Sequence, residues 1–207
     1  MKNKKVIILV ESALCVALST ALSFFAIYKS PFGGDVTFAS CLPIALLSYR
    51  RGIPCGIAAG FVYSIIQLLM GLENISYATG IWSAAAIIFL DYIIPFTIIG
   101  FSGMFRKTNR ENTKGLQMIT FGAGIAITLT LRYICHILSG AIVWHSLTVS
   151  WGVEENSLIA LFVDQPWLYS IVYNGIFMVP EIFITTIAGV IISSFLCLKN
   201  EKFSYKK

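Results

Sequence analysis

Long runs of apolar residues, separated by short polar segments, make up most of this chain of 207 residues. A helix that crosses the roughly 30 Å apolar core of a bilayer needs about 20 such residues. The pattern therefore predicts an all-α integral membrane protein, a single domain over residues 1–207 with six transmembrane helices, at about 6–28, 39–49, 55–70, 82–105, 116–143 and 167–197. The second and third runs are short, so we expect tilted helices or ordered loops that extend them.

The basic residues orient these six spans. Every Lys and Arg except Lys29 and Arg132 falls in a segment that the six spans place on one side of the membrane. Positively charged loops stay in the cytoplasm, so both termini are predicted to be cytoplasmic. The net charge of +5 is thus scattered over these loops and forms no patch for nucleic acid. Only 12% of the residues are charged, against about 25% in soluble domains, so we expect most of the chain to contact membrane lipid.

One apolar segment, residues 132–144, carries the most unusual polar pattern. Arg132, His136, Gly140 and Trp144 recur at every fourth position and share one face of a helix. A charge at membrane depth costs roughly 2.5–3.5 kcal/mol on insertion scales, so such residues usually face a bundle interior or a wet cavity. Asp91 of the fourth span is predicted at a similar depth. An ion pair between Arg132 and Asp91 that only staples two helices is therefore one interpretation.

The other interpretation is a binding pocket that opens to the outside. Tyr92, Tyr169 and Asn174 fall, like His136, in the outer halves of their predicted spans. Aromatic faces suit flat rings and organic cations, and a buried carboxylate suits a cation. Imidazole and amide groups add directional hydrogen bonds. Together they predict a site for a small, planar, cationic or neutral ligand.

Catalytic, metal-binding and ATP-binding patterns are missing from the sequence. It has no GxxxxGK phosphate loop, no GxSxG and no HExxH. The five cysteines lie in apolar segments without CxxC spacing, so we expect no metal and no cofactor. We predict that the protein is not an enzyme. A membrane enzyme or maturation factor that uses His136 with Asp91 or Glu181 is the alternative. Glu181 could relay protons or, next to Pro180, belong to a kink or to helix packing.

Small residues four apart mark the first span. Ala13, Ala17 and Ala21 form a smooth stripe on which another helix can pack closely, either within the same bundle or in a partner protein.

Five motifs, in order over nearly the whole chain, give the sequence a family resemblance. They are GGDVT at 33–37 with Pro43 downstream, RRG at 50–52, LDY at 90–92, RxxxHxxxGxxxW at 132–144 and YxxxYNG at 169–175. In these motifs the chain resembles the thiamine-specific substrate-binding (S) components of energy-coupling factor (ECF) transporters.

The resemblance implies a multi-pass subunit of the cell membrane that takes up a vitamin without an ATPase of its own. It would work with a shared transmembrane coupling subunit and two cytoplasmic ATPases. The implied thiamine site contains Asp91, Tyr92, His136, Trp144, Tyr169 and Asn174. The implied docking surface contains Ala13, Ala17 and Ala21.

To this site we add Gly34 and Asp35 of the first outer loop and Tyr63 of the third span. We expect the loops at 33–37 and 144–166 to close over the ligand. Thiamine or a close analogue is the expected ligand, and another small heterocyclic vitamin or precursor is the alternative.

Overall fold

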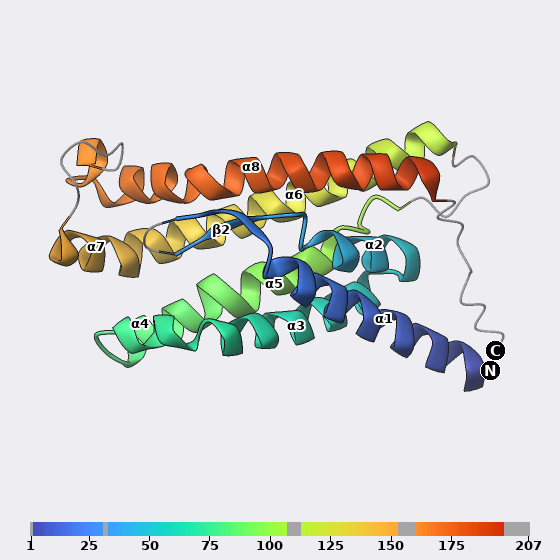
Figure 1. The fold of residues 1–207 in the computed structure, drawn as a ribbon, viewed down its shortest axis with the longest axis horizontal. Coiled ribbons are helices and arrows are strands. Elements are labelled where there is room, and N and C mark those ends of the chain that lie inside the picture. Colours follow the sequence, from blue (N-terminus) through green and yellow to red (C-terminus); the bar gives the residue numbers. More distant parts are fainter. Residues whose placement is uncertain (1, 31–32, 107–112, 153–159, 197–207) are drawn as a thin grey trace.

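The computed structural model describes residues 2–30, 33–106, 113–152 and 160–196. In this part of the chain long helices run side by side, with one short β-hairpin among them (Figure 1). The helices and strands are α1 (Lys2–Ser23), β1 (Ala26–Lys29), β2 (Asp35–Thr37), α2 (Leu42–Arg51), α3 (Ile53–Met70), α4 (Ile81–Ala86), α5 (Ile94–Ile98), α6 (Lys114–Ser139), α7 (His145–Trp151) and α8 (Pro166–Phe195). Short 3₁₀ helices lie at Leu72–Tyr77, Ile99–Phe101 and Ala160–Phe162, and π-helical segments at Ile87–Ile93 and Gly140–Trp144.

Five helices of the described chain are long and apolar enough to cross a membrane. They are Asn3–Ser23, Ile53–Met70, Ile81–Phe101, Lys114–Trp151 and Pro166–Phe195. The π-helical segments join α4 to α5 and α6 to α7, so each pair forms one continuous helix. The predicted span at 39–49 coincides with α2, which has 10 residues, about half of what a bilayer needs. The helical membrane fold is thus confirmed, and the count of six spans stays a prediction.

Two predicted boundaries are wrong. We predicted that the first helix extends to about residue 28, but α1 ends at Ser23 and Ala26–Lys29 forms a strand that pairs antiparallel with Asp35–Thr37. Aromatic and β-branched residues favour this strand, and Gly33 and Gly34 turn the chain with φ angles of 97° and 96°. The two strands therefore form backbone hydrogen bonds with each other.

The second wrong boundary is the loop predicted from residue 144. The helix instead continues through α7 and ends at Gly152, which adopts a φ of 87°. Gly152, and not Trp144, is therefore the residue in the sequence that marks the end of this helix. Residues 107–112, in the connection between the fourth and fifth predicted spans, residues 153–159 and the tail from 197 lie outside the described residues.

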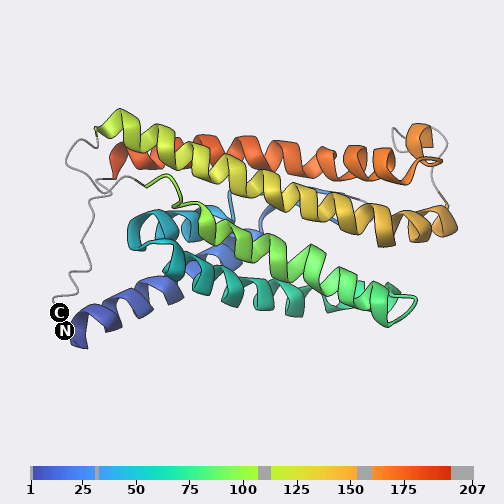
Figure 2. The same cartoon turned by 180° about the vertical axis from the view of Figure 1, so that it is seen from behind.

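The helices form two groups with the hairpin between them. Helices α6 and α8 lie side by side along their length, and α3 runs beside the α4–α5 helix (Figures 1 and 2). Helix α1 lies at the edge of the second group, and only 11% of its apolar window is buried. The hairpin contacts α8, and the core continues beneath it through α2. Residues of the hairpin and of both helix groups line a common cavity.

Candidate ligand-binding site

A cavity of about 830 Å³ lies between the two helix groups and the hairpin. Small-ligand sites usually have about 300–1,000 Å³. Its walls include parts of α3, the 3₁₀ helix Leu72–Tyr77, the π-helical segments, α6, α7, α8, β2 and the turn residues 33–34. Every predicted binding residue lines it: Gly34, Asp35, Tyr63, Asp91, Tyr92, His136, Trp144, Tyr169 and Asn174. The structure thus brings together residues that are up to 140 positions apart.

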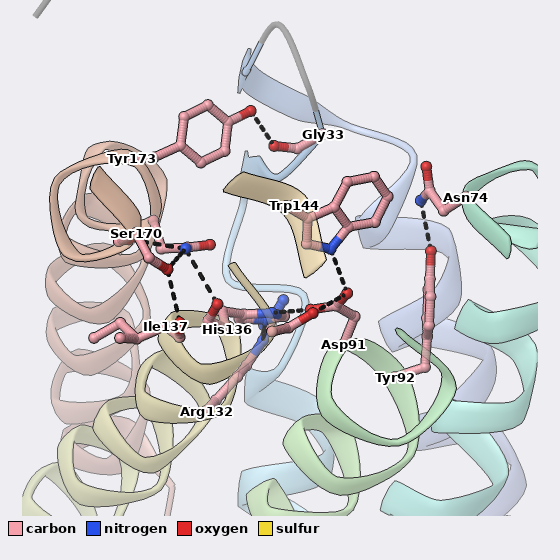
Figure 3. A network of polar contacts seen from close by, with 12 residues as sticks. Gly33, Asn74, Asp91, Tyr92, Arg132, His136, Ile137, Trp144, Ser170 and Tyr173 are labelled. Carbon is pink, nitrogen blue, oxygen red and sulfur yellow. Dashed lines mark hydrogen bonds and ion pairs between the residues drawn. The ribbon is translucent and has the colours of Figure 1, made fainter. Parts of the chain in front are cut away.

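Asp91 is held at the cavity wall by contacts with three side chains. Its carboxylate accepts from Ser139 Oγ at 2.7 Å and Trp144 Nε1 at 2.8 Å, and it lies 3.2 Å from His136 Nδ1 (Figure 3). Asp91 and Trp144 both belong to π-helical segments, which are rare and often occur at functional sites. Three donors thus hold a carboxylate in place beside the cavity.

His136 stands between Asp91 and Arg132. The Arg132 Nε atom donates to His136 Nε2 at 3.3 Å. Because a guanidinium only donates, Nε2 is the acceptor and the ring proton sits on Nδ1, where it points to Asp91. The direct pair of Arg132 with Asp91 that we considered is therefore wrong. The guanidinium instead contacts Cys41 Sγ at 3.1 Å and lies 4.3 Å above the centre of the Phe96 ring.

Asn174 is fixed through its amide nitrogen. This nitrogen donates to His136 O at 3.2 Å and to the backbone and side-chain oxygens of Ser170 at 2.9 and 3.1 Å. Gly140 makes this approach possible, because a Cβ atom there would collide with Ser170 Oγ and Asn174 Nδ2. No hydrogen bond within the described residues occupies Asn174 Oδ1, so this oxygen is the acceptor left for a ligand.

Aromatic rings form much of the remaining wall. The Tyr169 and Tyr173 rings stack with centroids 5.8 Å apart, and Tyr77 packs edge-on against Trp144 at 6.3 Å. The Tyr169 hydroxyl is held by Thr148 Oγ1 at 2.7 Å. Such walls fit flat rings, and they attract a cation through the electron-rich ring faces.

The hairpin forms the part of the cavity wall that the helices leave open. The Tyr173 hydroxyl donates to Gly33 O at 2.8 Å (Figure 3). Gly34 lies so close to the Phe177 ring that a Cβ would collide with it. At the base of the hairpin, the Glu181 carboxylate accepts from Thr37 N at 2.6 Å and Thr37 Oγ1 at 2.8 Å. Burial raises the pKa of the Asp35 carboxyl, and the charge of Lys29 partly opposes this shift.

Several wall residues are absent from the predicted site, among them Asn74 and Gln67. Asn74 Nδ2 donates to the Tyr92 hydroxyl at 2.7 Å, and that hydroxyl donates to Gly71 O at 3.2 Å (Figure 3). Nothing in the pattern around Asn74 pointed to the site, because the residue lies in a connecting segment. Gln67 also lines the cavity. Its spacing of four from Tyr63 was the available signal, since both residues fall on one face of α3.

The alanine stripe lies elsewhere. Ala13, Ala17 and Ala21 are exposed on α1, and none of them lines the cavity. Among the described residues no three His, Cys, Asp or Glu side chains come close enough to hold a metal ion.

A membrane-embedded helical bundle with an aromatic cavity and a fixed carboxylate defines a class of protein that binds a small organic molecule. The comparisons make the class specific. The thiamine transporter protein family (Thia_YuaJ) matches residues 9–203. The chain belongs to this family of multi-pass cell-membrane proteins.

Its relatives cover nearly the whole chain. Thiamine transporter ThiT of Bacillus subtilis (strain 168) is 29% identical over 192 residues, which span 90% of each chain. ThiT of Lacticaseibacillus paracasei is 25% identical over 178 residues, 84% of this chain and 80% of the relative. The solved structure of ThiT from Listeria monocytogenes has a TM-score of 0.70 at 25% identity, covering 93% of this chain and 96% of that one. These relatives are named as transporters, not as enzymes.

Proposed function

We propose that this protein binds thiamine in the cavity and serves as the substrate-binding subunit of an uptake transporter. The observation that carries the proposal is the Asp91 carboxylate, held by three side-chain donors in a cavity walled with aromatic rings. A carboxylate out of bulk water is costly unless it is paired. The neighbours of Asp91 are neutral hydrogen-bond donors, so a positive ligand would complete the pairing.

Thiamine offers the matching chemistry. Its thiazolium ring is a permanent cation for Asp91, and both of its rings are flat enough to lie against the aromatic wall that includes Trp144. Its amino group can donate to Asn174 Oδ1, the oxygen that the framework leaves free of hydrogen bonds within the described chain. In this arrangement the carboxylate supplies most of the affinity, while the amide fixes the orientation of the ligand.

The hairpin would control entry and exit. Its tip is held by the hydroxyl of Tyr173, and its base is held by Glu181. A contact between a hydroxyl and a carbonyl is easier to open than the contacts of a buried carboxylate with several donors. We therefore propose that the tip lifts to admit the ligand while the base stays fixed.

Coupling to ATP hydrolysis would require partners, and α1 provides a surface for one. Ala13, Ala17 and Ala21 are exposed on a helix that is mostly unburied in the isolated chain. Small side chains allow the backbone of another membrane helix to approach closely. We propose this stripe as the docking surface for a shared transmembrane coupling subunit, which would itself associate with two cytoplasmic ATPases.

Binding can be tested on the purified protein in detergent by calorimetry and by Trp fluorescence. Thiamine should bind and quench the fluorescence, and the Trp144→Phe variant should lose part of the quenching, because this indole lines the cavity together with that of Trp151. The matched control is Trp82→Phe, since Trp82 is 86% exposed and lies outside the cavity wall. Absence of heat and of quenching with thiamine and with its separate pyrimidine and thiazole fragments would disprove the proposal.

A further inference from the structure

Five buried side-chain atoms of the described chain have no hydrogen-bond partner. They are Ser19 Oγ, Ser30 Oγ, Gln67 Nε2, Thr97 Oγ1 and Thr186 Oγ1. A buried polar atom without a partner loses its hydrogen bond to water and so destabilises the folded protein. Ser30 and Gln67 line the cavity, and the other three do not. Gln67 has the larger capacity, because a primary amide carries two N–H donors and a carbonyl acceptor.

The surroundings of Gln67 show that the missing partner is not simply a matter of crowding. Gly71, at the C-terminal end of α3, lies one turn beyond Gln67. Its carbonyl oxygen accepts from the Tyr92 hydroxyl, which in turn accepts from Asn74. The polar groups of this wall therefore satisfy one another, while the Gln67 amide nitrogen remains without an acceptor. The Nε2 atom itself has almost no accessible surface, although the residue lines the cavity. A rotation of the terminal amide would bring the nitrogen to the cavity, where a ligand can supply the missing acceptor.

We infer that the side-chain amide of Gln67 rotates into the cavity and donates a hydrogen bond to the bound ligand. It is then a specificity residue of the α3 wall, selecting ligands that present a hydrogen-bond acceptor there. This inference rests on the proposed function. Thiamine carries suitable acceptors in its pyrimidine ring nitrogens and its hydroxyl oxygen. The ligand would then be contacted from two sides, by the Asp91 carboxylate and the Asn174 amide on one side and by the Gln67 amide of α3 on the other.

Gln67→Met tests this inference, since methionine keeps the length of the side chain and removes the amide. The dissociation constant for thiamine should rise about 3- to 10-fold, the usual effect of one hydrogen bond. The unfolding temperature without ligand should stay the same or rise, because an unpaired polar group has been removed. A structural glutamine would give the opposite sign, a fall in the unfolding temperature of the ligand-free protein.

Thr97→Val is the matched control. It also removes a buried, unpaired polar group, but from a residue outside the cavity wall. It should leave the dissociation constant unchanged. An affinity of Gln67→Met within twofold of wild type, or an equal loss in Thr97→Val, would overturn the inference.

Thiamine analogues identify the acceptor. Each analogue lacks one acceptor, either the hydroxyl or one of the pyrimidine ring nitrogens. The analogue that lacks the acceptor for Gln67 should bind to wild type and to Gln67→Met with equal affinity. If every analogue still distinguishes the two proteins as thiamine does, the inference is wrong. Failure of wild type to bind thiamine at all would instead refute the proposed function, so the two failures are distinguishable.

Discussion

Two acids, Asp91 and Glu181, occupy the interior of this membrane protein, and their surroundings differ. The Asp91 side chain is 15% exposed, and its donors are three side chains of the α6–α7 helix, of which His136 and Trp144 also line the cavity. Glu181 is 1% exposed and lies outside the cavity wall. Its donors include the backbone nitrogen and hydroxyl of Thr37. One carboxylate thus forms part of the cavity wall, and the other holds two segments of the fold together.

The difference shows how the two acids divide the work. Every donor of Asp91 is a side chain, which a ligand can supplement from the open side. Glu181 binds a backbone N–H that is 144 positions away in sequence, and it thereby ties α8 to the base of the hairpin. For Glu181 we considered a proton relay, a kink or a packing role. Its hydrogen bonds favour a structural role, as an anchor that acts on the ligand only through the position of the hairpin.

The largest effect in this comparison should come from Glu181→Leu. Loss of the carboxylate leaves the Thr37 N–H buried without its acceptor and removes the acceptor of the Thr185 hydroxyl, which costs about 3 kcal/mol of folding free energy. The Thr37 hydroxyl can still donate to Ser40 Oγ at 2.8 Å. The unfolding temperature in detergent, measured with and without thiamine, should fall strongly in both cases. Glu181→Gln is the control, since its amide oxygen can still accept from Thr37 N. An unchanged unfolding temperature in Glu181→Leu would refute the anchor role.

Asp91→Asn should show the reverse pattern. The variant keeps the shape and an acceptor oxygen but removes the charge that would pair with the thiazolium cation. We expect a loss of roughly 30- to 100-fold in thiamine affinity, since a charge-assisted contact contributes about 2–3 kcal/mol. The unfolding temperature should change little.

Ser139→Ala is the control for Asp91→Asn. It removes one donor to the carboxylate and leaves the charge in place, so its affinity loss should be clearly smaller. Isothermal calorimetry on the three proteins measures both effects. Equal affinities of wild type and Asp91→Asn would show that the carboxylate belongs to the structure alone, like Glu181.

Much of this architecture could be predicted from the sequence because it follows from periodicity. Apolar runs locate the long helices, since the bilayer core fixes their length and polarity. The spacing of four from Arg132 to Trp144 placed His136 and Trp144 on one helix face, and both line the cavity. These features are local along the chain, and a local pattern can report them.

The features that were missed depend on contacts between distant segments. The strand at Ala26–Lys29 forms because Asp35–Thr37 is available as a partner, although the residues are apolar enough for a helix. The partner of Arg132 depends on which of several nearby groups the packing presents, and depth alone suggested Asp91. Gln67 became notable only when the structure showed that its amide nitrogen is buried and unpaired. Hydropathy and spacing carry no information about such pairings.

The smallest expected effect concerns Asp35, the one acid of the hairpin. Burial raises the pKa of its carboxyl above the unfolded value, so the folded protein favours the protonated form. Its contribution to stability is complete below the unfolded pKa, about 3.9, and is lost as the pH rises through the folded pKa. Because the side chain is partly solvated, the effect should stay below about 1 kcal/mol.

Asp35→Asn should therefore reduce the difference in unfolding temperature between pH 4 and pH 7, and at pH 7 it should be at least as stable as wild type. Asp164→Asn, which removes an exposed acid, controls for the change in net charge. If Asp35→Asn instead destabilises the protein at pH 7, the attraction between Lys29 and Asp35 across the hairpin outweighs the cost of burial. Asp35 would then resemble Glu181 in holding the hairpin together by its charge, and the contrast between the acids of this protein would rest on Asp91 alone.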